Sequence, residues 1–359
     1  MPLTLAELER ALGEMDSGKA PGIDGIPAEF YLKFWDLIGL EFLNVIQESL
    51  RSGVMPLSLW RAVVSLLPKS GDLRRMENWR PVSLFCTDYK LYSKAMANRL
   101  KKVIGNLVLP DQTFCIPGHS IYDNIFLVRY LMCACYDRND FGIFFLDLEK
   151  AFDGIDHVFL WQILETYGFG VNFRAFIALL YTNIFSIMKV NNELISPIQV
   201  QRGVQQGCPV SGFLFAFAIE PRLCILRENI SGLNCFPRSP SLKISAYADD
   251  ICVIVRNRQD ITALTEFLRT FFLASSLQVN WKKSKALWVP HLKNCLPVVT
   301  PPPSLSENLE WNTEGVAYLG VFLGSTQFMK KNWEDTTEEI RKKLNRWGIP
   351  CQVHMPSRH

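Results

Sequence analysis

The chain lacks the long apolar run that a membrane-spanning helix requires, because its longest apolar stretch, Phe213 to Ile219, is far too short. It has no C-x-x-C pair, and Cys133 and Cys135 have no partner pair at zinc-site spacing. Its first residues form neither a basic start nor an apolar core, so no signal peptide is visible. We therefore predict an intracellular protein with reduced, mostly buried thiols.

The chain does have enough apolar material for a large core. At 359 residues and 48% hydrophobic, it suits one large domain with subdomains, or two domains. A net charge of +3 permits a nucleic-acid partner without requiring one. Predicted strands and helices mix without strict alternation, which favours an α+β fold: an antiparallel sheet with helices packed on one side.

Two adjacent carboxylates lie at a predicted hairpin turn. Tyr247-Ala248-Asp249-Asp250 separates an alternating run, 242–246, from an apolar run, 251–255. Like charges this close raise one another's pKa unless a cation lies between them. Two interpretations stay open here: a solvated turn, in which Asp is common, and a magnesium site.

A third acid follows a predicted buried strand. Residues 142–146 are wholly apolar and lead directly to Asp147. If this strand pairs with the acidic hairpin in one sheet, Asp147 and Asp249 come side by side. Carboxylates so placed can hold two magnesium ions, which clamp the attacking 3′-oxygen and the leaving pyrophosphate of a nucleotidyl transfer.

A glycine-rich loop and scattered basic residues accompany the acids. The loop, Gly203 to Gly212, precedes an apolar helix predicted over 213–227, and its glycines permit close approach by a nucleotide or template base. A tight loop before a core helix is an equally good interpretation. Lys69, Arg80 and Lys283 are either ordinary surface charges or phosphate ligands.

Seven blocks of the sequence, taken in order, resemble the reverse transcriptase of LINE-type non-LTR retrotransposons, nearest to the branch found in vertebrates and other animals. The blocks are Gly18 to Gly25, Leu67 to Lys69 with Asn78 to Leu84, Leu146 to His157, Arg202 to Phe215, Tyr247 to Asp250, Val279 to Ser284, and Tyr318 to Gly320. Group II intron maturases share the acids but fit the first two blocks less well.

The resemblance implies a right-hand polymerase fold, with fingers, a palm whose antiparallel sheet is backed by helices, and a partial thumb. The implied divisions are an N-terminal extension and fingers helix at 1–60, fingers at 61–140, palm at 141–325 with a fingers/palm helix segment at 157–185, and the start of a truncated thumb at 326–359. The family's polyprotein also has an endonuclease and a complete thumb, which we expect in a parent protein but do not find in this sequence.

The resemblance also implies a set of catalytic groups. Asp147, Asp249 and Asp250 are the implied metal-binding acids, and the carbonyl of Leu148 is an implied further ligand. The implied cofactor is a pair of Mg²⁺ ions, with Mn²⁺ as an alternative. Lys283 resembles the acid that protonates the leaving pyrophosphate.

Nucleotide selection is implied for four residues: Lys69, Arg80, Phe152 and Gln206. The Phe152 ring would leave no room for a 2′-hydroxyl, although core packing is the alternative interpretation. Arg80 as a planar fork and Lys69 as a point charge would hold the triphosphate, and Gln206 would line the pocket. The turn at Tyr318, Leu319 and Gly320 resembles the grip on the primer end.

The implied partners are an RNA template, a DNA primer and dNTPs, with no membrane, and the implied location is the nucleus. Two hypotheses follow: an RNA-directed DNA polymerase, or an inactive remnant that folds and binds nucleic acid without polymerising. The sequence departs from the family at Gln205 and His119, where basic residues are common, and at Gly212, where Pro is common. The two lost charges weaken any hold on template phosphates.

Overall fold

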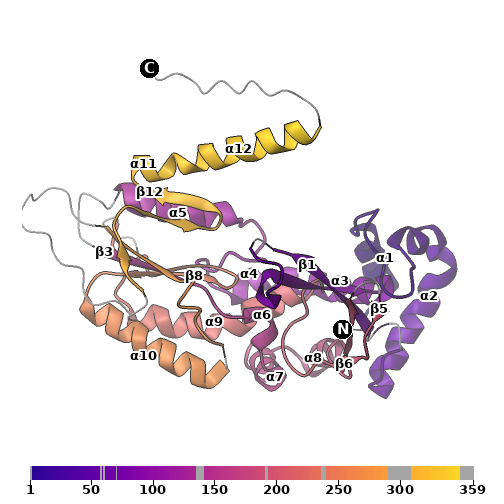
Figure 1. Cartoon of the computed structure of the whole chain (residues 1–359). Helices are drawn as coiled ribbons and strands as arrows, with labels where there is room; N and C mark the ends of the chain where they lie inside the picture. Colours follow the sequence, from indigo (N-terminus) through magenta and orange to yellow (C-terminus); the bar gives the residue numbers. More distant parts are fainter. Residues whose placement is uncertain are drawn as a thin grey trace, which may run out of the picture. The chain divides into compact units, whose positions relative to one another are not determined.

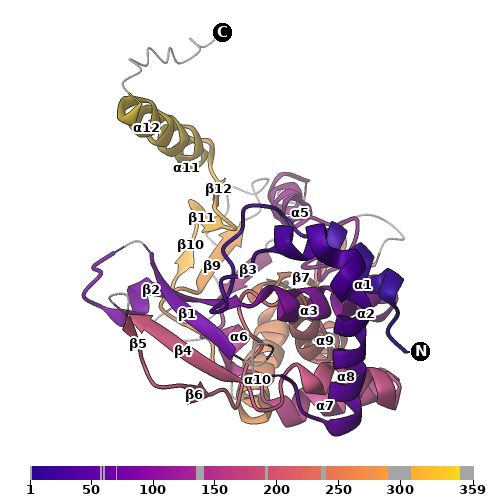
Figure 2. The same ribbon diagram turned by 90° about the vertical axis from the view of Figure 1, so that its right-hand side faces the viewer.

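The computed structural model describes residues 2–56, 59, 61–69, 71–134, 141–190, 193–235, 240–275, 277–289 and 309–347. The chain forms two compact units, each built of helices and strands (Figure 1 and Figure 2). Unit 1 comprises Met1–His119, Glu149–Cys224 and Thr270–Gln278, and unit 2 comprises Ser120–Leu148, Ile225–Arg269 and Val279–His359. Within the described residues, no helix is both long enough and apolar enough to cross a bilayer.

Helices form much of unit 1. Helix α1 (Leu5–Gly13) begins with a capping box, in which Thr4 and Glu7 each accept a hydrogen bond from the other's backbone N–H. It packs against α2 (Ala28–Ser52) and α3 (Thr87–Lys101). The other helical elements are η2 (Met76–Asn78), α4 (Ile104–Leu107), α6 (Ala151–Gly154), α7 (His157–Thr166), α8 (Val171–Leu179) and α9 (Ser211–Asn229), whose last turn enters unit 2.

Unit 1 also contains a mixed five-stranded sheet, visible in Figure 2. Strand β1 (Arg61–Pro68) pairs antiparallel with β2 (Trp79–Phe85) and parallel with β4 (Phe185–Val190). Strand β4 also pairs with the short β5 (Glu193–Leu194) and β6 (Ile198–Gln199). The β1–β2 hairpin therefore presents its turn, residues 69–78, at one end of this sheet.

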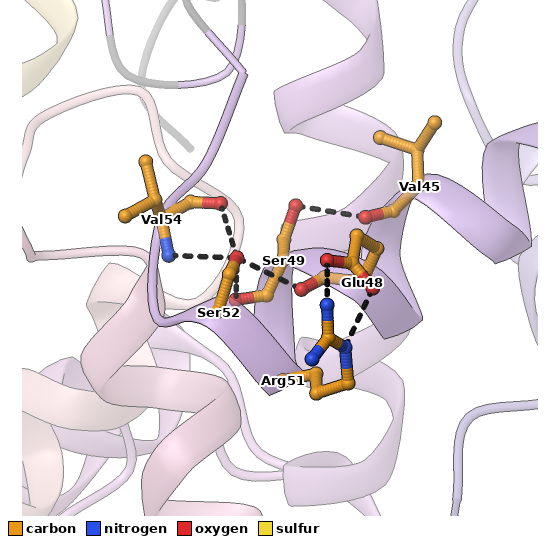
Figure 3. Close-up of polar contacts among 6 residues, drawn as sticks. All are labelled: Val45, Glu48, Ser49, Arg51, Ser52 and Val54. Carbon is orange, nitrogen blue, oxygen red and sulfur yellow. Dashed lines mark hydrogen bonds and ion pairs between the residues drawn. The ribbon is translucent and has the colours of Figure 1, made fainter.

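At the C-terminal end of α2, polar side chains form hydrogen bonds with neighbouring residues of the same helix (Figure 3). Glu48 accepts two hydrogen bonds from Arg51, at 2.8 and 2.6 Å. Ser49 donates to the carbonyl of Val45 at 2.8 Å, and Ser52 donates to that of Glu48 at 2.9 Å. Val45, Glu48, Ser49 and Ser52 line a groove of about 520 Å³. Because their polar groups bond within the helix, the groove has the chemistry of a helix end rather than of a catalytic site.

Unit 2 is built on a sheet of strand order β10-β9-β3-β8-β7. The central strand β3 (Phe141–Leu146) is antiparallel to β8 (Asp250–Val255) and to β9 (Lys285–Val289). Strand β7 (Ile244–Tyr247) is antiparallel to β8, and β10 (Trp311–Asn312) is parallel to β9. The predicted α+β class with an antiparallel central sheet is confirmed.

Helices cover both faces of this sheet, whereas the sequence analysis placed them on one. All six residues of β3 are buried, as its apolar side chains on both faces require. Figure 1 shows α5 (Ile121–Ala134) on one side of the sheet and α10 (Arg258–Ser275) on the other. The core on the α5 side joins Ile125, Val128 and Leu131 to alternate β3 residues.

A hairpin and two helices complete unit 2. Strands β11 (Gly315–Tyr318) and β12 (Val321–Gly324) pair antiparallel, and Val316, Tyr318 and Leu323 join the core under α5. Helices α11 (Thr326–Met329) and α12 (Lys331–Arg346) follow, and no residue of α12 is buried. Residues 297–306, whose proline- and serine-rich composition predicts an exposed loop, lie outside the described residues.

The remaining differences from the sequence analysis concern helices near the N-terminus. Helix α1 was not predicted, although Thr4 and Glu7 have capping-box spacing. The sequence predicts a helix over 29–50 from the spacing of apolar residues such as Phe30, Phe34 and Leu37, and α2 forms there. However, Leu37 is 76% exposed and the buried face is a different one. Apolar periodicity indicates a helix, but it does not decide which side meets the rest of the protein.

Candidate active site

The acidic pair lies where β7 turns into β8, at the hairpin that the sequence predicts: Asp249 is in the turn, and Asp250 is the first residue of β8. Tyr247 pairs with Asp250, so Ala248 and Asp249 are the two central residues of the turn. Ala248 has φ of +54°, in the left-handed region that costs a residue with a Cβ on the order of 1 kcal/mol. Backbone strain is thus stored next to both acids.

Asp147 lies at the same end of the sheet because β3 pairs with β8. Leu146 is in register with Ile251, so Asp147 follows this pair on one strand where Asp250 precedes it on the other. The Asp147 N–H donates to Ser284 Oγ at 3.1 Å, and its carbonyl accepts the Asn280 N–H at 2.8 Å. Sequence reasoning did not identify these two supports, although they lie four residues apart in the block that contains Lys283.

The carboxylates act on one another. Burial, and then the charges of Asp249 and Asp147, raise the pKa of Asp250 to about 6, while the ammonium groups of Lys283 and Lys285 oppose the shift. A pKa raised in this way indicates negative charge in excess of what its surroundings stabilise. A divalent cation would relieve that excess, and the donors are the oxygens that magnesium prefers, so the residues fit the implied ion.

A cavity of about 430 Å³ is lined by Asp147 and Asp250, but not by Asp249, and all of its lining residues belong to unit 2. Its lining includes Asp147, Asp250, Lys283, Tyr318 and Leu319. The unit therefore brings two of the predicted acids, the predicted acid–base lysine and part of the predicted primer grip to one cavity. The backbone groups of the primer-grip turn and the ammonium groups make this cavity suited to an anionic ligand beside a cation.

A second group of possible metal ligands, missed by sequence reasoning, lies in unit 1. Ligand atoms of Asp24, Cys86 and Asp88 lie within 4.8 Å of one another, which the three acids of unit 2 do not as a set. Burial raises the pKa of the Cys86 thiol to about 11, so the thiol is protonated at neutral pH. A protonated thiol is a poor ligand, and magnesium favours oxygen, so this group is no competitor for the magnesium role.

The predicted primer grip is the turn between β11 and β12. Leu319 and Gly320 have φ of +48° and +81°, as in a two-residue hairpin turn with both central residues left-handed. The Tyr318 ring is 4% exposed and packs on Phe145, with 4.9 Å between ring centroids. The turn backbone and Leu319 are therefore more accessible to a nucleic acid than the phenol is.

Phe152 lies in unit 1, on α6. Its ring stacks on that of Phe215 from α9, with centroids 4.4 Å apart and an interplanar angle of 11°. Phe114 meets Phe152 edge-on at 6.2 Å. The Phe152 side chain is only partly buried, so the ring is fixed by its neighbours while some of its surface stays accessible.

The glycine-rich loop is held by contacts along its length. The Gln206 carbonyl accepts the N–H of Ser83 in β2 at 3.2 Å. A Cβ at Gly207, where φ is +105°, would lie 2.7 Å from the Ser83 carbonyl oxygen, so this approach needs glycine. Tyr89 Oη donates to Cys208 Sγ at 3.3 Å. The Gln206 side chain stays partly exposed at this fixed loop.

Lys69 and Arg80 extend exposed side chains from the turn end of the β1–β2 hairpin. The Lys69 N–H donates to the Asn78 carbonyl at 2.8 Å, which fixes its backbone. Burial raises the pKa of Asp153, and the ammonium groups of Lys150 and Lys69 oppose that shift. Unit 1 therefore brings the Lys69 charge near the residue that follows Phe152.

The structure shows the surroundings of two positions that depart from the family pattern, Gln205 and Gly212. Gln205 is 7% exposed, and neither its amide nitrogen nor its amide oxygen has a hydrogen-bond partner among the described residues. A Cβ at Gly212 would lie 2.5 Å from Cys115 Sγ and 3.3 Å from the Phe114 ring, so a larger residue there requires these side chains to shift. Position 205 is therefore directed into the protein rather than toward solvent.

Comparison with known proteins gives one family. The family model described as reverse transcriptase (RNA-dependent DNA polymerase) matches residues 67–323. The transposon TX1 uncharacterized 149 kDa protein of Xenopus laevis is 40% identical over 349 residues, which cover 96% of this chain and 26% of that protein. The probable RNA-directed DNA polymerase from transposon BS of Drosophila melanogaster is 24% identical over 96% of this chain and 38% of its own length.

The Pol polyprotein from retrotransposable element R2DM of Drosophila melanogaster is also similar, at 24% identity over 95% of this chain and 32% of that protein. Among solved structures, apo telomerase of Candida tropicalis covers 75% of this chain and 57% of its own, with a TM-score of 0.48 and 11% identity. The chain thus spans about a quarter of its Xenopus relative. The family match across residues 67–323 and the 40% identity to the Xenopus protein together show that the chain belongs to the reverse transcriptases, as a reverse transcriptase domain of the non-LTR retrotransposon type with a right-hand polymerase fold.

Proposed function

We propose that this chain is an RNA-directed DNA polymerase domain that joins dNTPs to a DNA 3′-end on an RNA template by a two-metal mechanism. The observation that carries the proposal is the β3–β8 register, which brings Asp147 and the Asp249–Asp250 turn to one end of one sheet. The raised pKa of Asp250, caused first by burial and then by Asp249 and Asp147, supports a cation site there.

Asp147 and Asp249 would hold both Mg²⁺ ions, with Asp250 a less direct ligand and the Leu148 carbonyl a further one. When bound, the ions lower the pKa of the primer 3′-hydroxyl and neutralise charge on the triphosphate. The 3′-hydroxyl would lose its proton to solvent water, and the bond from the 3′-oxygen to the α-phosphorus would form as the bond to pyrophosphate breaks. Lys283, which lines the same cavity as Asp147 and Asp250, would give its proton to the leaving pyrophosphate.

The residues of unit 1 would select the nucleotide. Lys69 would attract the triphosphate as a compact charge, and Arg80 would pair with it as a planar fork. The Phe152 ring, fixed by its stack on Phe215, would exclude a 2′-hydroxyl. The Gln206 loop, tied to β2 through Ser83, would line the base side of the pocket.

The proposal extends to the partners of the reaction. The turn at Tyr318, Leu319 and Gly320 would contact the primer strand, and the basic residues would contact template and primer phosphates. We also propose the division implied by the family resemblance: an N-terminal extension and fingers helix at 1–60, fingers at 61–140, palm at 141–325 and the start of a thumb at 326–359. Acting on a DNA 3′-end of a genome would place the reaction in the nucleus.

Magnesium-dependent incorporation of dNTPs on an RNA template with a DNA primer tests the proposal, with Asp249→Asn measured beside it. We expect incorporation by the chain and none above background by the variant, because Asp249 is an ion ligand. Primer-template binding, measured for both proteins, separates the alternative hypothesis. Equal binding with no incorporation by either protein would identify an inactive remnant instead.

A further inference from the structure

The segment after Phe152 and the start of the glycine-rich loop are joined by a ladder of bonds within unit 1. The N–H of Val204 donates to the Phe152 carbonyl, and the N–H of Gly203 donates to the Ile155 carbonyl, both at 2.7 Å. A Cβ at Gly203, where φ is +86°, would lie 2.7 Å from the Asp153 backbone. The backbone that carries Phe152 and the backbone that leads to Gln206 therefore lie against each other.

One side chain also bonds to this ladder. His157, the first residue of α7, has Nε2 at 2.9 Å from the Gly203 carbonyl oxygen. A carbonyl only accepts, so Nε2 carries the proton and donates it. Gly203 is thereby bonded through both its N–H and its carbonyl to the segment 155–157.

The His157 ring is itself fixed by aromatic neighbours. Its centroid lies 5.3 Å from that of Tyr181, at an angle of 70°, and 6.0 Å from that of Trp161. Tyr181 is 5% exposed, and its Oη lies 3.2 Å from Ser211 Oγ at the far end of the loop. The imidazole thus touches a ring that also holds the other end of the loop carrying Gln206.

We propose that His157 is a positioning residue for deoxynucleotide selection, which sets the separation between the Phe152 ring and the Gln206 loop. A sugar-excluding ring works only if the opposite wall of the pocket cannot retreat, since a displacement of about 1 Å changes such discrimination strongly. Phe152 supplies one wall, and the bond from His157 to Gly203 holds the other. This inference rests on the proposed polymerase function.

Two substitutions at His157 separate the hydrogen bond from the bulk of the ring. In His157→Gln the amide nitrogen is four bonds from Cα, as Nε2 is, whereas in His157→Asn it is only three bonds away. Thr166→Ala is the control, because Thr166 lies on an exposed part of the same helix. Among the described residues, its hydroxyl bonds only to the Gln162 carbonyl, at 2.9 Å.

The measurement is the ratio of kcat/KM for a dNTP to that for the matching rNTP, on an RNA template with a DNA primer. We expect the ratio to fall about fivefold to tenfold in His157→Asn, as for the loss of one hydrogen bond. It should stay within about twofold in His157→Gln and Thr166→Ala by the same reasoning. An unchanged ratio in His157→Asn, or an equal fall in the Asn and Gln variants, overturns the proposal.

Amide hydrogen exchange provides a readout that does not need activity. The Gly203 and Val204 amides should exchange faster in His157→Asn than in the unsubstituted chain, and at the original rate in His157→Gln. If the unsubstituted chain incorporates nothing, the polymerase proposal fails and the selection role of His157 fails with it. Hydrogen exchange then still shows whether the hydrogen bond from His157 to Gly203 exists. If incorporation is normal and the ratio does not respond, only the role of His157 is refuted.

Discussion

The acid cavity of unit 2 and the glycine-rich loop of unit 1 are built on opposite principles. At the acid cavity, partly buried like charges oppose one another, and the pKa of Asp250 rises to about 6 through burial, Asp249 and Asp147. In the loop, backbone groups bond to neighbouring segments, as Gly203 does with Ile155 and His157. Uncompensated negative charge is stabilised when a cation binds beside it. Polar groups that are already hydrogen-bonded gain nothing from a ligand and instead fix the conformation of the loop.

The sharpest test of this comparison removes one charge from the cavity. Asp147→Asn should lower kcat for dNTP incorporation by at least about a hundredfold, because a neutral amide oxygen holds a divalent ion much more weakly than a carboxylate does. Steady-state incorporation at saturating Mg²⁺ gives the value. The matched control is Glu149→Gln, which removes an exposed charge two residues away and should leave kcat within about twofold. Equal losses in both variants would contradict a ligand role for Asp147.

The next test concerns shape in unit 1. Phe152→Ala should lower the ratio of dNTP to rNTP incorporation on the order of tenfold to a hundredfold, because the ring that excludes a 2′-hydroxyl is gone. Phe215→Leu should give a smaller change in the same direction, because Phe152 keeps its ring but loses the stack at 4.4 Å. The ratio of dNTP to rNTP incorporation is the measurement.

Phe217→Leu provides the control for Phe215→Leu, because Phe217 lies on the same helix and packs on Tyr167 and Phe169 instead. Both positions are fully buried, so both variants should lose stability by about 1–2 kcal/mol. Only the Phe215 variant should change the sugar preference. A change of equal size in the Phe217 variant would show that general loosening, rather than the stack on Phe152, sets the selectivity.

The pH dependence of stability should differ between the two regions. The pKa of Asp250 in the folded protein, about 6, lies above its value in the unfolded chain, so this group favours the folded state at low pH. That contribution, at most about 3 kcal/mol, is lost as pH rises from about 4 to 6. Asp250→Asn should therefore be more stable than the unsubstituted chain at pH 7, and the gap should narrow at low pH.

Glu7 in unit 1 has the opposite sign. Hydrogen bonds from Arg99 lower its pKa to about 2, so its contribution is present at neutral pH and is lost as pH falls from about 4.5 toward 2. Thermal unfolding of Asp250→Asn and Glu7→Gln across pH 3–7, without divalent ions, separates the two. Added Mg²⁺ should shrink the pH 7 advantage of Asp250→Asn and leave the Glu7 variant unaffected. An identical Mg²⁺ response in both would count against a metal site at Asp250.

The acid cavity of unit 2 could be predicted from the sequence more fully than the glycine-rich loop of unit 1. Asp147 follows a short apolar strand and Asp249 lies at the turn before another, so the local pattern predicts both strand ends. That the two acids meet depends on the pairing of β3 with β8, which the sequence pattern gives only as a condition. Charge placed against hydrophobicity is a local signal. The supports of that site, Asn280 and Ser284, have an ordinary turn composition and became visible only through their bonds to the Asp147 backbone.

The loop was harder to predict because its order comes from tertiary contacts. Tyr89 and Tyr181 precede the loop by more than 20 residues in the chain. No local pattern links them to the loop, yet Tyr89 bonds to Cys208 and Tyr181 to Ser211. Likewise, the apolar spacing in α2 revealed a helix but not that Leu37 lies on its exposed side. The periodicity of apolar residues predicts whether a segment is a helix or a strand. It does not predict which other segments the element packs against, because those can lie far away in the chain.

Gln205 is the exception to the satisfied character of the loop, and it gives the smallest expected effect. Its amide is buried, and both polar atoms lack a hydrogen-bond partner among the described residues. Removing an unsatisfied buried amide while keeping the volume should stabilise a fold. We expect Gln205→Met to raise the free energy of unfolding by about 1 kcal/mol.

The neighbouring Gln206→Met is the matched control, because Gln206 is partly exposed and its backbone, rather than its amide, bonds to Ser83. That variant should leave stability within about 0.5 kcal/mol and weaken dNTP incorporation, which reverses the pattern expected for Gln205→Met. Urea unfolding of both variants, beside incorporation at limiting dNTP, gives the two pairs of values. If Gln205→Met proves less stable than the unsubstituted chain, its amide has a bound partner such as an internal water, and the loop is satisfied throughout.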